Sequence, residues 1–185
     1  MDAFLVSTGL VALAETGDKT QLLAILLAAR FRKPLPIILG ILVATLANHA
    51  VAGAFGHWLA DLVDPDIMRW VLGVSFLAMA VWALIPDHVD DLRAESGHWG
   101  VFATTLTAFF LAEMGDKTQI ATVALAAQYQ SLLAVVAGTT LGMMLANVPA
   151  VYLGERITRR IPIPLIHKIA ALIFAVLGLM ILLLP

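Results

Sequence analysis

The sequence predicts an all-α membrane protein with six transmembrane helices, arranged as two inverted three-helix repeats. One observation behind this prediction is composition, because 61% of the 185 residues are hydrophobic and only 13% are charged. Soluble domains are far less apolar than this. A spanning helix needs about 20 mostly apolar residues, so the chain can hold about six spans joined by short loops. We therefore expect it to lie in a lipid bilayer.

An internal repeat is the second observation. Residues 13–21 read Leu-Ala-Glu-Thr-Gly-Asp-Lys-Thr-Gln, and residues 111–119 repeat this string with a single change, Thr to Met. Farther along, Leu-Ala-Asn at 46–48 is matched by Leu-Ala-Asn at 145–147. Chance similarity between apolar helices would not reproduce a polar string and a later landmark in the same order. We infer that the chain is a duplication.

Apolar runs place three spans in each half. The expected spans cover residues 4–29, 34–60, 67–86, 102–127, 131–154 and 168–185. They divide the chain into a first three-helix repeat at 1–86, a charged cytoplasmic linker at 87–101, and a second repeat at 102–185. Because three is an odd number, the second repeat enters the membrane from the opposite side, as in many secondary transporters. The linker is either a solvated loop or a weak cation sensor.

The basic residues predict the orientation of the spans. Arg69 is the only Lys or Arg at the ends of the spans on one side of the membrane, and the other side has eight. These eight are Arg30, Arg32, Lys33, Arg93, Arg156, Arg159, Arg160 and Lys168. By the positive-inside rule the basic side is cytoplasmic, so both termini face outward.

Composition also excludes several functions. The net charge is −2 and no basic stripe exists to neutralise phosphates, so we expect no nucleic-acid partner. The chain has no cysteine, which excludes disulfides, thiolate metal sites and a cysteine nucleophile.

Four carboxylates fall near the middle of the first and fourth spans: Glu15, Asp18, Glu113 and Asp116. Each charge at the centre of a membrane helix costs about 2.5–3.5 kcal/mol on an insertion scale, so such residues are functional candidates by default. The alternative is a structural network of salt bridges. Spacings of three place side chains on one helix face, and the repeat supplies the same set from a second helix.

The predicted metal ligands are therefore Glu15, Asp18, Gln21, Glu113, Asp116 and Gln119. An all-oxygen, carboxylate-rich set suits hard divalent cations, namely Ca²⁺, Mn²⁺ or Mg²⁺. His49, alone in the second span, is interpreted as a packed or hydrogen-bonded residue and not as a ligand.

Glycine falls inside both copies of the motif, at Gly17 and Gly115. Local unwinding there would expose backbone carbonyls as further ligands, as in the broken helices of transporters. Alternatively, the glycines let two helices approach closely. Both interpretations remain open at this point.

A second group of residues is assigned to metal binding or proton coupling: Lys19, Lys117, Thr20, Thr118, Asn48 and Asn147. An ammonium group beside the acidic residues would lower their repulsion until a cation displaces it. Closely spaced carboxylates also retain a proton, so cations and protons would compete for the site. The threonines either ligate or bond back to their own helix, and the asparagines either ligate or form interhelical hydrogen bonds.

Two copies of Glu-x-Gly-Asp-Lys-Thr, each in the first span of a three-span repeat, resemble the family of Golgi manganese/calcium transporters and its small bacterial manganese-exporting relatives. The resemblance covers essentially the whole chain, and the compact length is similar to the bacterial branch. It implies a cation/proton antiporter that exports Mn²⁺, with Ca²⁺ as the alternative, across a bacterial inner membrane. Both termini would then be periplasmic, and the four acidic residues of the two motifs would be ligands.

Two other functions compete with this one. A membrane-embedded lipid-phosphate hydrolase would need arginine or histidine near the phosphate, but every arginine lies outside the spans or at their edges. An uncoupled cation channel would need no four-carboxylate trap. We expect no enzyme activity and no prosthetic group. The partners are a divalent cation, protons and lipid, and the oligomeric state is left open.

Overall fold

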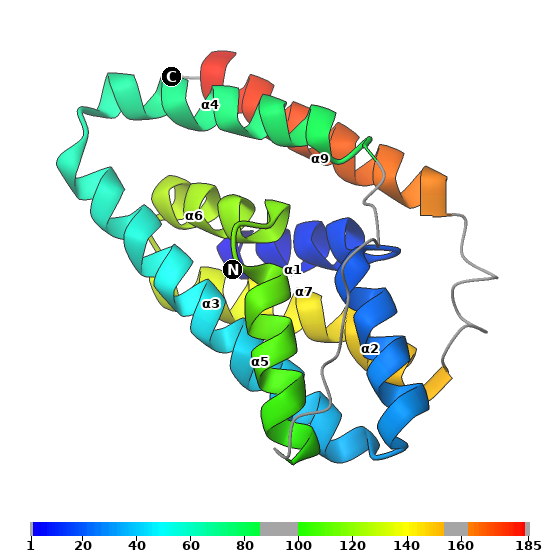
Figure 1. The fold of residues 1–185 in the computed structure, drawn as a ribbon. Helices are drawn as coiled ribbons and strands as arrows, with labels where there is room; N and C mark the ends of the chain where they lie inside the picture. The colour runs from blue at the N-terminus through cyan, green and yellow to red at the C-terminus, as the bar shows by residue number, and fades with distance from the viewer. Residues whose placement is uncertain (1, 86–99, 154–162, 184–185) are drawn as a thin grey trace.

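The computed structural model describes residues 2–85, 100–153 and 163–183, and this part of the chain is all-helical (Figure 1). Its helices are α1 (Asp2–Glu15), α2 (Lys19–Phe31), α3 (Pro34–Leu62), α4 (Pro65–Trp82), α5 (Val101–Glu113), α6 (Lys117–Tyr129), α7 (Leu132–Leu153) and α9 (Ile163–Leu183). The predicted linker at 87–101 lies outside the described residues except for its last two positions.

Four of these helices, α3, α4, α7 and α9, are long and apolar enough to cross a membrane. The other two predicted spans, 4–29 and 102–127, are not continuous helices. Each is divided into two helices of 13 or 14 residues, α1 with α2 and α5 with α6. A helix of that length is about 20 Å long, which is shorter than the roughly 30 Å hydrocarbon core.

The interruptions occur at the glycines of the repeated motif. Gly17 has φ +87° and Gly115 has φ +77°, a backbone conformation that side chains with a Cβ rarely adopt. Asp18 and Asp116 then act as the N-caps of α2 and α6, both in extended conformation. Local unwinding of the helix is observed at both glycines. Close approach of a second helix is observed as well at Gly17, where a Cβ would lie 2.5 Å from Cγ2 of Ile163 in α9.

The two halves also share the way their second short helix ends. Arg32 after α2 and Gln130 after α6 both adopt the left-handed conformation, with φ of 52° and 47°. Pro34 then begins α3 and Leu132 begins α7. The breaks and the turns therefore recur at corresponding positions of the duplicated sequence.

Close helix packing surrounds the short helices. On α7, a Cβ at Gly138 would lie 2.6 Å from the Phe4 carbonyl oxygen, and one at Gly142 would lie 2.6 Å from the Thr8 carbonyl oxygen. These two glycines thus bring α7 against α1 within one chain. Helix α3 packs against α5, α6 and α7.

Helices α4 and α9 form a separate pair. They lie side by side along one edge of the remaining helices (Figure 1), and a Cβ at Gly178 would lie 2.9 Å from the Gly73 carbonyl oxygen. Phe76 and Phe174 stack within this pair, with ring centroids 6.2 Å apart. The opposite faces of α4 and α9 expose large apolar side chains such as Val74 and Leu172, as expected for helices that contact lipid.

Candidate metal centre

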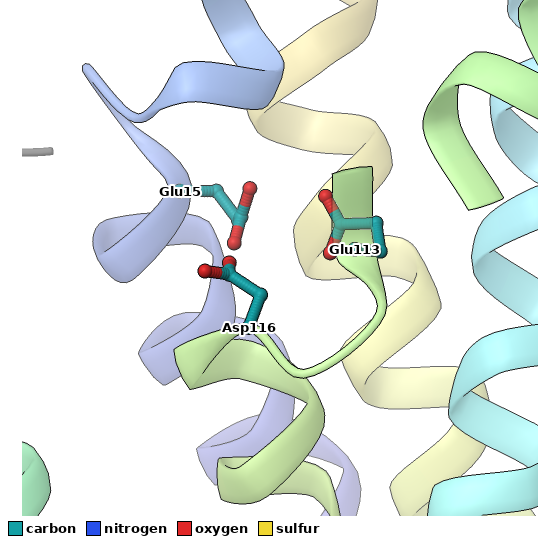
Figure 2. A group of neighbouring side chains, drawn as sticks. All are labelled: Glu15, Glu113 and Asp116. Carbon is teal, nitrogen blue, oxygen red and sulfur yellow. The ribbon is translucent and has the colours of Figure 1, made fainter. Parts of the chain in front are cut away.

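Three carboxylates meet where the two helix breaks approach one another. Glu15 is the last residue of α1, Glu113 is the last residue of α5, and Asp116 caps α6. One oxygen from each lies within 4.8 Å of the other two, and the side chains point toward a common centre (Figure 2). All three residues are buried, with 0%, 0% and 3% of their surface exposed. The breaks position them, because each glutamate ends a helix just before its motif glycine.

Two salt bridges cross between the halves of the chain. The Nζ atom of Lys19 lies 2.9 Å from Oδ1 of Asp116, and Nζ of Lys117 lies 2.5 Å from Oδ1 of Asp18. We predicted ammonium groups beside the acidic residues, and the structure adds that each lysine pairs with the aspartate of the opposite repeat. The second pair is the more buried one, since the Lys117 side chain is 5% exposed and the Lys19 side chain 26%.

The threonines of the motif do not bond back to carbonyls of their own helix, and ligation by them stays a prediction. Thr20 donates a hydrogen bond to Oε2 of Glu15 at 2.6 Å, and Thr118 donates to Oε2 of Glu113 at 3.2 Å. Each hydroxyl therefore orients the glutamate of its own half. The other oxygen, Oε1, of both glutamates is buried and has no hydrogen-bond partner among the described residues. A buried acceptor of this kind calls for an explanation, and a bound cation is one.

The motif glutamines close the helix breaks. Oε1 of Gln21 accepts from the Gly17 amide at 2.9 Å, and Oε1 of Gln119 accepts from the Gly115 amide at 2.7 Å. Gln21 also donates through Nε2 to the Ala146 carbonyl oxygen at 2.9 Å, which ties the first break to α7. Their oxygens are thus engaged with backbone, and metal binding by these two residues stays a prediction.

The two asparagines differ despite their matching positions. Asn48 donates to the Phe110 carbonyl oxygen at 3.1 Å, which is the interhelical hydrogen bond considered as the alternative to ligation. Asn147 donates within its own helix to the carbonyl oxygen and sulfur of Met143, at 3.1 and 3.0 Å. Its Oδ1 is buried and has no partner among the described residues. Of the two asparagines, Asn147 therefore presents the buried oxygen that has no partner in the described part of the chain.

Two histidines differ in their hydrogen bonding. His49 is fully buried, and neither ring nitrogen has a hydrogen-bond partner in the described part of the chain, so it is packed but not hydrogen-bonded. His167, which the sequence did not single out, places Nε2 3.2 Å from the carbonyl oxygen of Thr16 in the first break. Nothing in the motif could have indicated this contact, because the corresponding residue of the first half is Met68.

Comparison with known proteins identifies the family. The model of the family "Divalent cation/proton antiporter GDT1" matches residues 3–91 and 101–184. A Vibrio cholerae protein named "Putative manganese exporter" is 53% identical over 97% of this chain and 90% of its own length. "GDT1-like protein sll0615" of Synechocystis is 28% identical over 94% of this chain and 93% of its own. "GDT1-like protein 4" of japonica rice is 26% identical over 94% of this chain and 70% of its own.

No solved structure matches this chain. The resemblance drawn from the doubled motif is confirmed, and so is the prediction of a transporter and not an enzyme, because the matched family consists of antiporters. The chain belongs to the GDT1 family of divalent cation/proton antiporters.

The two crossed salt bridges should differ in their contribution to stability. Lys117→Met removes the partner of the fully buried Asp18 carboxylate, and breaking a buried pair costs about 3–5 kcal/mol. Lys19→Met removes a lysine whose side chain is 26% exposed from an aspartate that is itself buried, so we expect a smaller loss, of about 1–3 kcal/mol. The unfolding midpoint of purified protein in detergent measures both. An equal or larger loss for Lys19→Met would contradict the assignment, and adding Asp18→Asn to Lys117→Met should restore part of the stability.

Proposed function

We propose that this antiporter exports Mn²⁺ from the cytoplasm in exchange for protons, through a site built on Glu15, Glu113 and Asp116. The observation that carries the proposal is the convergence of three buried carboxylates from two helix breaks. Like charges held this close repel one another unless a cation or a proton lies between them. A divalent cation would satisfy all three at once.

The charge balance of the motif also fits a divalent ion. Its four carboxylates carry four negative charges when ionised, and Lys19 and Lys117 carry two positive charges. The difference, two negative charges, is what one divalent cation would neutralise. In this proposal Asp18 completes the acidic set, with Lys117 held against it until the cation arrives.

The choice of metal rests on donor chemistry and on one relative. An oxygen-only site disfavours Zn²⁺ and Cu⁺ and suits Mn²⁺, Ca²⁺ or Mg²⁺. The 53% identical Vibrio cholerae protein is named "Putative manganese exporter", and this name favours Mn²⁺ over Ca²⁺ for this chain as well. Asn147, with its buried and unpaired Oδ1, is the neutral ligand we add to the acidic set. Gln21 and Gln119 support the site by holding the breaks.

Proton exchange follows from the same carboxylates. A carboxylate must lose its proton before it can bind a metal ion, so cation and proton occupy the same oxygens in turn. The hydrogen bonds from Thr20 and Thr118 hold one oxygen of each glutamate and leave the other for the cation or the proton. An uncoupled channel would not need cations and protons to compete for one site. Coupling of cation flux to proton flux therefore distinguishes an antiporter from a channel.

For the membrane arrangement, we propose that α1 with α2 and α5 with α6 each complete one interrupted span, which gives six spans in two inverted repeats. The family model matches two segments, 3–91 and 101–184, and the gap between them falls inside the proposed linker at 87–101, which supports this division into repeats at 1–86 and 102–185. The basic residues then place the linker in the cytoplasm and both termini in the periplasm of a bacterial inner membrane.

Substitution of the acidic residues tests the site. Glu15→Gln, Glu113→Gln and Asp116→Asn should each lower Mn²⁺ transport in proteoliposomes by roughly 10–100-fold, since each removes a charge-assisted contact worth about 1.5–3 kcal/mol. Asp61→Asn, at an exposed position near the end of α3, is the matched control and should transport normally. Retention of transport by any of the three site variants, with folding verified by size-exclusion chromatography, would refute the three-carboxylate site.

Single cysteines test the inverted arrangement, because the natural chain has none. Lys33 and Ser131 occupy corresponding positions of the two repeats, in the turns before α3 and α7. A membrane-impermeant maleimide added to intact spheroplasts should label Ser131→Cys at once and Lys33→Cys only after the membrane is permeabilised. Labelling of both from the same side would show that the repeats are not inverted.

A further inference from the structure

The first turn of α9 covers the break between α1 and α2. A Cβ at Gly17 would lie 2.5 Å from Cγ2 of Ile163, so the helix packs directly on the motif glycine. One turn along α9, His167 places Nε2 3.2 Å from the Thr16 carbonyl oxygen. The break leaves this carbonyl without a backbone partner, because no N–H of the described backbone donates to it. The histidine therefore supplies the hydrogen bond that a continuous helix would have provided.

Among the described residues, no helix covers the corresponding break of the second half in this way. No described residue lies within 4 Å of the position that a Cβ would take at Gly115, and the preceding Met114 is 56% exposed. The two breaks thus share their acidic residues and their glycine conformation, but different residues surround them.

The sequences that begin α4 and α9 are related, which makes the difference between them informative. At the offset of 99, Pro65 corresponds to Pro164, and Ile67 corresponds to Ile166. The residue matching His167 is Met68, which is buried in the apolar core and whose side chain has no N–H to donate. In the part of the chain that the structure describes, the hydrogen bond from a side chain of α9 to a break therefore has no counterpart from α4.

We propose that His167 is a positioning residue for the cation site, which holds the peptide after Glu15 by donating a hydrogen bond to the Thr16 carbonyl oxygen. This inference rests on the proposed function, because the site being positioned is the proposed cation site. Thr16 follows Glu15 directly, so fixing its peptide group fixes the backbone from which the Glu15 carboxylate extends. Glu113 and Asp116 come from the uncovered break and lack this constraint.

The two halves of the site therefore differ in how strongly hydrogen bonds constrain their glutamates. In the first half, Glu15 is oriented by Thr20 and its backbone is braced by His167. In the second half, Glu113 has the longer hydrogen bond to Thr118, at 3.2 Å, and its break has no brace among the described residues. The cation would bind first against the preorganised Glu15, and the second half would close on it.

A matched pair of variants separates the hydrogen bond from simple packing. His167→Gln keeps an N–H donor on a flexible side chain, and His167→Met has nearly the same length without a donor and reproduces the residue of the first half. Hydrogen–deuterium exchange of the purified protein in detergent would be followed in a peptide spanning 13–22, with the peptide spanning 111–120 as the internal control. Exchange in the first peptide should rise about 2–10-fold in His167→Met, the factor that one hydrogen bond is worth, and should stay at the wild-type rate in His167→Gln.

Mn²⁺ transport in proteoliposomes gives the functional readout. We expect KM for Mn²⁺ to rise about 2–10-fold in His167→Met with kcat within about twofold of wild type, and both constants to be normal in His167→Gln. If His167→Met does not fold, as judged by size-exclusion chromatography, His167→Leu takes its place.

Equal behaviour of the two variants, in exchange or in KM, would overturn the proposal, because packing and not the hydrogen bond would then be responsible. Faster exchange with an unchanged KM would overturn it too, since the contact would brace the fold without positioning the site. If wild-type protein moves no Mn²⁺, the proposed function fails, and the exchange comparison alone then decides whether His167 holds the first break.

Discussion

The structure depends on burying four carboxylates among apolar helices. Such charges are stable in a protein interior only when they are paired and hydrogen-bonded. Here two lysines pair across the repeats, Lys19 with Asp116 and Lys117 with Asp18, so each half of the chain supplies a lysine to the aspartate of the other. Each aspartate also caps a helix, α2 or α6, where the helix dipole favours negative charge. The salt bridges that stabilise the buried aspartates therefore also join the two halves of the chain at the site.

The breaks in the first and fourth predicted spans follow from the same constraint. In a continuous helix, the glutamate and the aspartate of the motif would both lie in the interior of that one helix. With the helix interrupted at a glycine of positive φ, Glu15 and Glu113 end one helix each, and the aspartates cap the next. The glutamines then satisfy the glycine amides that the break exposes. Acids, glycines and glutamines of the motif thus form one structural unit, which explains why they occur together in both copies.

The acidic site and the helix breaks could be predicted from the sequence, because the motif that specifies them is short and occurs twice. The duplicated string indicated the acidic site, and Gly17 and Gly115 indicated the unwinding as one of two alternatives. The crossed pairing of the lysines could not be predicted, because it depends on how two distant segments face one another. The hydrogen bonds from the threonines to the glutamates were not foreseen either, because they form only where the break turns the hydroxyls toward those glutamates.

The contact of His167 with the first break had no sequence signal at all. The repeat would have placed equivalent residues over both breaks, but α9 has a histidine where α4 has Met68. Internal symmetry in the sequence therefore predicts what the two halves share and is silent on where they differ. In a transporter built from repeats, such differences distinguish the two sides of the site.

The most direct test of the account is to measure Mn²⁺ and proton movement together. Purified protein would be reconstituted in liposomes that hold a Mn²⁺-sensitive dye and a pH dye, with and without an imposed proton gradient. We expect Mn²⁺ influx with opposing proton efflux, faster when the gradient drives protons outward, and loss of both signals in Glu15→Gln. Mn²⁺ flux that neither moves protons nor responds to the gradient would contradict the shared carboxylate site on which the account rests.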